Sequence, residues 1–151
     1  MTGQGTILMQ ASAVAIEGRA VVIKGPPGSG KSTLAMALID RGAELVGDDG
    51  MRLTRQEGAV IAHPPPHTAG KLEIRGVGIA HLPATSAKVS LIVSLDDAGE
   101  RLPDVVPMQT LEGCKVPYLG LAESDPASLP LRVEWALRIH GLPANGVSDW
   151  A

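Results

Sequence analysis

The sequence of 151 residues contains almost no aromatic side chains and a single cysteine. Phe is absent and aromatic residues make up 2% of the chain, so the core must be built from Val, Ile, Leu, Ala and Met. One cysteine, Cys114, excludes an intramolecular disulfide framework and a zinc site made of cysteines alone. This cysteine usage fits a reducing compartment.

Long apolar runs and clusters of basic residues are missing as well. No Lys or Arg precedes Arg19, and the apolar stretch 7–16 is interrupted by Gln10 and Ser12. This is a poor signal peptide and too short for a membrane span, so we expect a cytoplasmic protein. The net charge is -3 and no basic patch is visible, which argues against nucleic acid as the main partner.

Turn signals divide the chain into short strands and helices within one domain, which we place at residues 6–142, followed by a tail at 143–151. Residues 1–5 are expected to be loose. Gly18 and Gly58 lie in turns that should fold 12–16 with 20–23, and 51–54 with 59–62, into hairpins. Helices are expected at 32–39 and 131–139, and a central strand at 88–95. Residues 96–130 are rich in Asp, Gly and Pro and carry only short apolar pieces.

A phosphate-binding loop is the strongest motif. Residues 25–32 match the pattern G-x-x-x-x-G-K-[ST] between a β-rich run and a helical pattern, a context that disfavours an ordinary glycine-rich turn. The glycines let backbone N–H groups and the helix N-terminus face an anion. Lys31 would reach the β- and γ-phosphates, and Ser32 would hold Mg²⁺. We predict that a nucleoside triphosphate or another polyphosphate is bound by Gly25, Pro26, Pro27, Gly28, Ser29, Gly30, Lys31, Ser32 and Thr33.

Phosphoryl transfer also needs a carboxylate near the metal and a group that accepts a proton from the nucleophile. Asp48 and Asp49 follow a short predicted strand at 44–47, so one could face the metal and the other an incoming hydroxyl. An ordinary Asp-Asp-Gly turn is the alternative. Glu73 and Arg75 alternate with apolar residues, so on a strand both charges would face one side. They could equally be a solvated ion pair.

These segments together resemble the C-terminal catalytic domain of HPr kinase/phosphorylase. The similarity rests on the loop, the step Gly47-Asp48-Asp49, and the run Leu72-Glu73-Ile74-Arg75-Gly76-Val77-Gly78-Ile79, which is a distinctive signature of that family. It covers roughly residues 8–95 well and is weaker afterwards. The chain looks like a short bacterial form without the N-terminal domain of the family.

The resemblance implies an α/β fold of the P-loop type, in the phosphoenolpyruvate-carboxykinase-like variant with a mixed sheet and many hairpins. It also implies phosphorylation of a serine of the phosphocarrier protein HPr by ATP or pyrophosphate with Mg²⁺, reversal by phosphorolysis, and a hexamer. Lys31 matches the lysine on the phosphates, Asp48 the residue that takes the serine proton, and Arg75 a supporting charge. The metal ligands it implies are Ser32, Glu73 and Asp49.

Two departures from the family pattern leave alternatives open. Gln10 stands where the family usually has a histidine, and Gln cannot titrate near neutral pH. Residues 123–128 contain no arginine where the family has one, and losing such a cation can cost orders of magnitude in rate. A non-catalytic nucleotide-binding regulator is therefore one alternative. A small-molecule kinase is another, although no arginine-rich lid is visible.

The histidines give little support for a metal site. His63 and His67 flank three prolines, and neither they nor His81 have a neighbouring cysteine or carboxylate cluster. Because zinc sites need three or four converging ligands, we expect none here.

Overall fold

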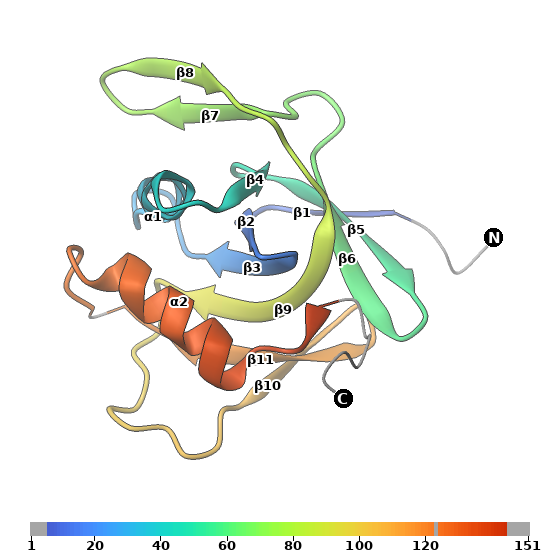
Figure 1. The fold of residues 1–151 in the computed structure, drawn as a ribbon, viewed down its shortest axis with the longest axis vertical. Coiled ribbons are helices and arrows are strands. Elements are labelled where there is room, and N and C mark those ends of the chain that lie inside the picture. The colour runs from blue at the N-terminus through green and yellow to red at the C-terminus, as the bar shows by residue number, and fades with distance from the viewer. Residues whose placement is uncertain (1–5, 123, 145–151) are drawn as a thin grey trace.

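A computed structural model describes residues 6–122 and 124–144, so the predicted loose start at 1–5 and residues 145–151 of the predicted tail lie outside the described residues. The described chain is a mixed α/β fold (Figure 1). In chain order its elements are β1 (Ile7–Met9), β2 (Ser12–Ile16), β3 (Arg19–Lys24), α1 (Lys31–Asp40), β4 (Glu44–Gly47), β5 (Met51–Gln56), β6 (Ala59–His63), β7 (Lys71–Ile74), β8 (Gly78–His81), β9 (Ala87–Ser94), β10 (Met108–Leu111), β11 (Cys114–Gly120) and α2 (Leu129–His140).

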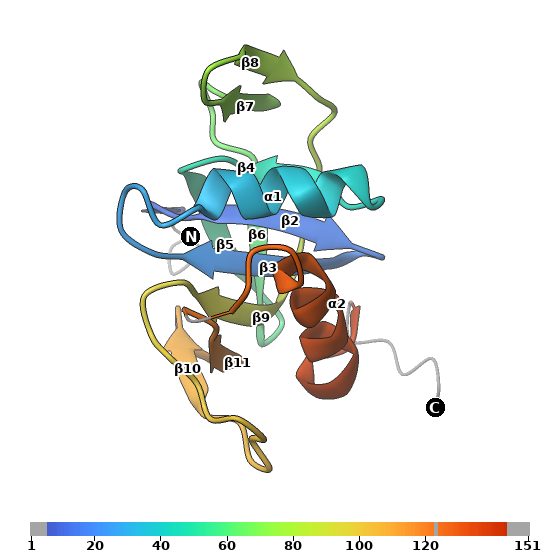
Figure 2. The same ribbon diagram turned by 90° about the vertical axis from the view of Figure 1, so that its left-hand side faces the viewer.

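Most strands form one curled sheet around the parallel pair β3 and β9. The strand order is β1-β5-β6-β9-β3-β2-β4, and β11 pairs with β9 and with β10 beside this path. Figure 1 shows β9 bending strongly, and its start pairs with β6 while its end pairs with β11. The strands β7 and β8 form a separate hairpin that lies beyond α1 and β4 (Figure 2).

The sheet has a core on each face. Successive residues of β3 point to opposite faces, so Val21 and Ile23 pack beneath the two helices while Ala20 and Val22 face the inside of the curl. Leu38 of α1 is fully buried in the helix-side core, a burial that stabilises the fold by roughly 1.5–3 kcal/mol. The prediction of a core without Phe is confirmed, since Val, Ile, Leu, Ala and Met make up the buried hydrophobic residues.

The predicted fold class, both hairpins and both helices are confirmed. The strands β10 and β11, which lie within residues 96–130, were not predicted. One prediction was wrong. The run 72–79 is not one strand: β7 ends at Ile74, and Arg75 lies in the turn to β8. Glu73 and Arg75 therefore do not share one face of a single strand.

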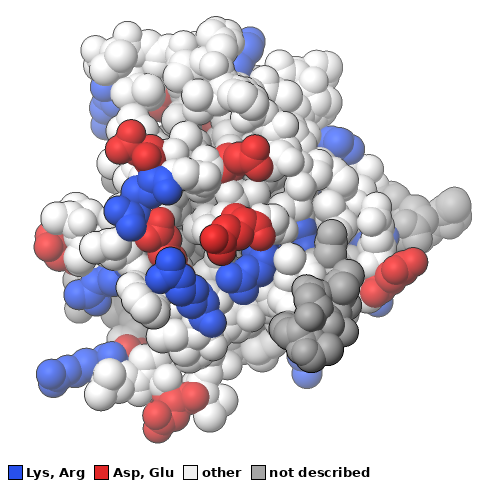
Figure 3. Space-filling view, viewed as in Figure 1, with Lys and Arg blue, Asp and Glu red and all other residues white. Residues whose placement is uncertain are grey.

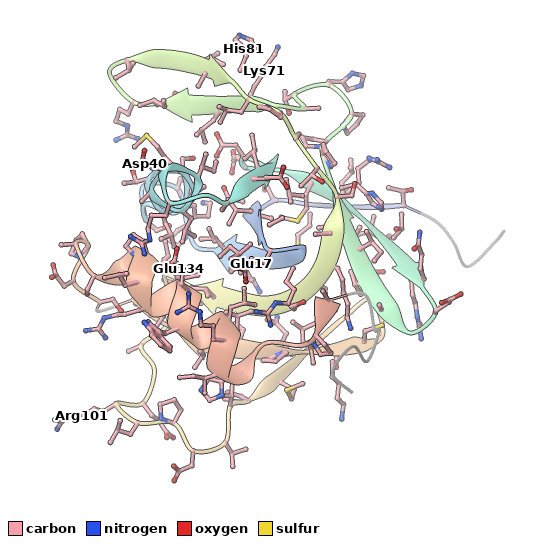
Figure 4. All side chains as sticks on the ribbon, in the orientation of Figure 1. Glu17, Asp40, Lys71, His81, Arg101 and Glu134 are labelled. Carbon is pink, nitrogen blue, oxygen red and sulfur yellow. The ribbon has the colours of Figure 1, made fainter. Side chains whose placement is uncertain are left out.

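The two helices are joined by an ion pair at the surface. The Arg41 guanidinium donates two hydrogen bonds of 2.9 Å to the Glu134 carboxylate, which raises the pKa of Arg41. Figure 4 shows Glu134 on α2 at the side that faces α1. Acidic and basic side chains are interspersed over this face of the molecule (Figure 3). Neither of the described helices has the length and apolar character that a membrane span requires.

His63 gives a prediction for the dependence of stability on pH. Its ring bonds to Thr54 Oγ1 at 2.7 Å and to Ser86 Oγ at 2.8 Å, and burial, then the charge of Arg52, lowers its pKa below 6.5. The unfolded chain therefore binds this proton more readily, so stability is full above the unfolded pKa and falls as the pH drops through it. We expect the melting temperature to fall between about pH 7.5 and about pH 5.5, and to fall less in His63→Gln.

The matched control is His81→Gln, because His81 is exposed on β8. This variant should keep the pH dependence of the unchanged protein. An equal fall of the melting temperature in the unchanged protein and in His63→Gln would contradict the assignment to His63.

Candidate active site

The loop between β3 and α1 has the shape of an anion cradle. Gly28 and Gly30 have φ values of 82° and 100°, a left-handed conformation that residues with a Cβ rarely adopt. The Ser29 N–H donates to the Pro26 carbonyl at 3.1 Å, which closes the loop on itself. No side chain in the described part of the chain caps the start of α1, so the N–H groups of its first turn are available to an anion.

Lys31 and Ser29 complete this cradle. Lys31 Nζ donates to the Gly25 carbonyl at 2.7 Å and to the Pro26 carbonyl at 3.3 Å. An ammonium group has three protons, so one is left for an anionic ligand. The Ser29 hydroxyl is buried and has no hydrogen-bond partner among the residues that the structure describes. These observations fit a bound polyphosphate.

Three strand ends meet beside the loop. The strand β2 is antiparallel to both β3 and β4, with Ser12 opposite Ile23 and Ala13 opposite Gly47. The start of β2 therefore lies between the end of β3, which enters the loop, and the end of β4, which Asp48 follows. This register brings Ser12 and Asp48 to the phosphate-binding loop.

Asp48 is held at both carboxylate oxygens. Its Oδ1 accepts hydrogen bonds from Ser32 Oγ at 2.5 Å and from Ser12 Oγ at 3.3 Å. Its Oδ2 accepts the backbone N–H of Glu73 at 3.1 Å. Asp48 thus connects the loop, β2 and the hairpin β7–β8. Because a carboxylate oxygen has about two acceptor sites, Oδ1 is filled and Oδ2 keeps one.

A cleft of about 460 Å³ lies over these groups. It is lined by Gln10, Gly25, Pro27, Gly28, Gly30, Lys31, Ser32, Thr33, Met36, Asp48, Asp49, Glu73, Ile74 and Arg75. All the residues that the sequence singled out as catalytic or metal-binding are in this set. Of the predicted phosphate-binding residues, Pro26 and Ser29 do not line the cleft; they are hydrogen-bonded to each other within the loop.

The predicted side chains do not all enter the hydrogen-bond network. Glu73 joins it through its backbone N–H, and Asp49 does too, by donating from its backbone to Ser12 Oγ at 3.1 Å. Arg75 reaches the cleft from the turn of the hairpin. Sequence reasoning missed Ser12 as a member of the site. The predicted hairpin of 12–16 with 20–23 was the signal that could have found it. This hairpin places Ser12 opposite Ile23, two residues before the phosphate-binding loop begins.

The donor set suits Mg²⁺ better than zinc. Across residues 6–122 and 124–144, no three His, Cys, Asp or Glu side chains converge as a metal site. Mg²⁺ is usually bound by one or two carboxylates together with substrate phosphates and waters, so it does not need such a cluster. The Ser32 hydroxyl gives its proton to Asp48 and therefore has oxygen lone pairs left for a cation.

The histidines and Arg132 lie apart from the cleft lining. Figure 4 shows His81 and Lys71 on the hairpin β7–β8, pointing away from the body of the molecule. His63 is bonded to Thr54 and Ser86, and Arg132 donates from Nε to Ser128 Oγ at 3.1 Å. Neither these histidines nor Arg132 line the cleft.

Comparison with known proteins places this geometry in a family. Residues 5–147 match the family model described as the HPr Serine kinase C-terminal domain. An HPr kinase/phosphorylase of Bordetella petrii is 34% identical over 144 residues, which cover 86% of this chain and 47% of the relative. One of Clostridium tetani is 42% identical over 71 residues, covering 47% of this chain and 23% of the relative. The chain thus spans less than half the length of these relatives.

A solved structure agrees with the sequence comparison. The HPr(Ser) kinase/phosphatase from Coxiella burnetii superposes with a TM-score of 0.76 at 29% identity, covering 89% of this chain and 90% of that one. The phosphate-binding loop, the Asp48 network and the hairpin that carries Glu73 all lie within the matched residues 5–147. This chain belongs to the HPr serine kinase C-terminal domain family.

Proposed function

We propose that this chain is a cytoplasmic protein-serine kinase and phosphorylase that transfers phosphate from ATP, or from pyrophosphate, to the phosphocarrier protein HPr. The observation that carries the proposal is the environment of Asp48. Its carboxylate accepts hydrogen bonds from Ser32 at the start of α1 and from the hairpin β7–β8, Oδ2 accepts only one hydrogen bond from the described residues, and Asp48 lines the cleft. That is the arrangement required of a base between a phosphate donor and a hydroxyl acceptor.

On the donor side, the polyphosphate would lie in the loop. The N–H groups of residues 28–31 and the N-terminus of α1 would bind the β-phosphate, and the third proton of Lys31 Nζ would bind a β- or γ-oxygen. Arg75, from the turn of the hairpin, would meet the charge that develops on the transferred group. Ser32 together with the carboxylates of Asp49 and Glu73 would hold Mg²⁺, which neutralises phosphate charge when bound.

On the acceptor side, the serine hydroxyl would approach Asp48. Its oxygen forms the new bond to the γ-phosphorus, the bond from that phosphorus to the β–γ bridging oxygen breaks, and the proton passes to Oδ2 of Asp48. In phosphorolysis, which reverses transfer from pyrophosphate, an oxygen of inorganic phosphate forms a bond to the phosphorus of phosphoserine and the bond from that phosphorus to the serine oxygen breaks. Pyrophosphate leaves the site, and Asp48 returns the proton to the serine oxygen. Ser12 and Ser32 keep donating to Oδ1 throughout.

A second candidate function is a nucleotide-binding regulator without phosphate transfer. Gln10 lines the cleft where the family usually has a histidine, and its amide can bind phosphate but cannot exchange a proton near neutral pH. The described residues also bring no Arg other than Arg75 to the lining of the cleft. Both features would leave binding intact and weaken the chemical step.

The test is incubation with purified HPr, Mg²⁺ and ATP labelled in the γ-phosphate, followed by mass analysis of HPr. We expect a gain of one phosphate on a serine, and no gain on an HPr variant with alanine at that serine. ATP binding without transfer would overturn the kinase and select the regulator. In that case Gln10→His in the same assay would show whether the histidine alone restores transfer.

A further inference from the structure

We propose that Ser12, the first residue of β2, is the positioning residue of Asp48. Its hydroxyl donates to Asp48 Oδ1 at 3.3 Å and accepts the backbone N–H of Asp49 at 3.1 Å. One buried side chain therefore contacts both residues of the acidic pair. The effect on catalysis rests on the proposed function, whereas the contacts themselves do not.

The place of Ser12 in the fold explains how it can hold this position. It is 0% exposed, and β2 is paired on both sides, with β3 and with β4. The Ser12 side chain therefore has little room to change its position. Its hydroxyl proton forms the hydrogen bond to Asp48, and one of its lone pairs accepts the N–H of Asp49. The residue lies where the end of β4 passes into the Asp48–Asp49 turn.

The turn that Ser12 holds is unfavourable by itself. Asp49 has a φ of 61°, a left-handed conformation that is uncommon outside glycine. The bond from its N–H to Ser12 Oγ fixes the peptide between Asp48 and Asp49. The second bond, from Ser12 Oγ to Oδ1, fixes the rotation of the Asp48 carboxylate. The hydrogen bonds from Ser12 and Ser32 occupy Oδ1. Oδ2 is therefore the oxygen that can take the proton of a substrate hydroxyl.

Ser90 provides a matched control within the same chain. It is also 0% exposed, and its Oγ donates to the Lys88 carbonyl of its own strand at 3.2 Å. It does not line the cleft. Ser12→Ala and Ser90→Ala each remove one buried hydroxyl, and only the first removes a contact with the acidic pair.

The experiment measures transfer to HPr in four variants: Ser12→Ala, Ser90→Ala, Asp48→Asn, and Ser12→Ala combined with Asp48→Asn. We expect kcat to fall by about fivefold to tenfold in Ser12→Ala, with KM for ATP unchanged within about twofold, since the hydroxyl positions the base and does not touch the nucleotide. Ser90→Ala should keep the kcat of the unchanged protein. In the Asp48→Asn background, Ser12→Ala should cause no further loss, because it acts through Asp48.

Two outcomes would overturn the positioning role: an unchanged kcat in Ser12→Ala, or an equal loss in Ser90→Ala. If the unchanged chain transfers no phosphate at all, the proposed function is refuted and the transfer assay cannot test Ser12.

Hydrogen exchange tests Ser12 without any activity. Exchange at the Asp49 amide should accelerate in Ser12→Ala and stay slow in Ser90→Ala. Equal exchange in both variants would refute the role of Ser12 independently of activity.

Discussion

Asp48→Asn should lower kcat for phosphate transfer to HPr by about 10²–10⁴-fold, the range expected when a general base is lost. The amide has nearly the same size as the carboxylate, so the fold should survive. An amide oxygen in the Oδ1 position could still accept from Ser12 and Ser32. The NH₂ group would then replace Oδ2, where it cannot accept a proton and where it faces the N–H of Glu73 instead of bonding to it.

The binding of nucleotide should respond differently from the rate. The change to Asn removes a negative charge beside the phosphates, so the Kd of ATP should not rise. The loss of activity should therefore be a lower kcat and not weaker binding of ATP. The matched control is Asp40→Asn, which removes a carboxylate at the opposite end of α1 (Figure 4). It should keep the kcat of the unchanged protein. Unchanged turnover in Asp48→Asn would remove Asp48 from the role of base.

The elements that could be predicted from the sequence are those with local signals. The turns at Gly18 and Gly58 lie between apolar runs and define two hairpins without any knowledge of distant contacts. The phosphate-binding loop follows from a motif whose flanking strand and helix are adjacent in the chain. The strand β9 was also recognisable, because its apolar residues Val89 and 91–93 follow one another closely, as in a strand that is buried on both faces.

The missed strands β10 and β11 form a hairpin across the turn Glu112-Gly113, which has the left-handed conformation of the turns at Gly18 and Gly58, so a local signal was present. Only the pairing of β11 with β9 joins residues that are distant in the sequence. The strand β11 contains Pro117, a residue that usually argues against a strand, and it is stabilised by parallel pairing with β9 through Tyr118, Leu119 and Gly120.

The register of the central strands could not be predicted either. A register shift in the pairing of β9 with β3 leaves Ser90 without a partner in β3. No local pattern in the sequence encodes that shift.

The site shows the same division. Lys31 and Ser32 follow from the motif, and Asp48 from the end of a predicted strand. The approach of the hairpin to Asp48 could not be predicted from the sequence. The Glu73 N–H bonds to Oδ2 only because the hairpin β7–β8 lies over α1 in the folded chain (Figure 2). Ser12 was missed because a serine at the start of a strand has no chemical signature. Only the register of β2 between β3 and β4 gives it a role.

Lys31→Ala should reduce both the affinity for ATP and the rate of transfer, with kcat falling by about 10²–10³-fold, the loss expected when one group that stabilises transition-state charge is removed. The variant also removes the two bonds from Nζ to the carbonyls of Gly25 and Pro26, so the loop loses part of its support. Lys31→Arg should restore little, because a planar guanidinium cannot replace a compact ammonium in so tight a loop.

Lys24→Ala is the matched control, since Lys24 ends β3 directly before the loop and its Nζ lies 5.9 Å from the centre of the Tyr118 ring, outside the cleft lining. This variant should bind ATP and phosphorylate HPr as the unchanged protein does. Titration of each protein with ATP and Mg²⁺ by calorimetry, beside the transfer assay, separates binding from chemistry. Full binding and full transfer in Lys31→Ala would contradict the placement of the polyphosphate in this loop, and with it the role of Asp48 as the base beside a donor bound there.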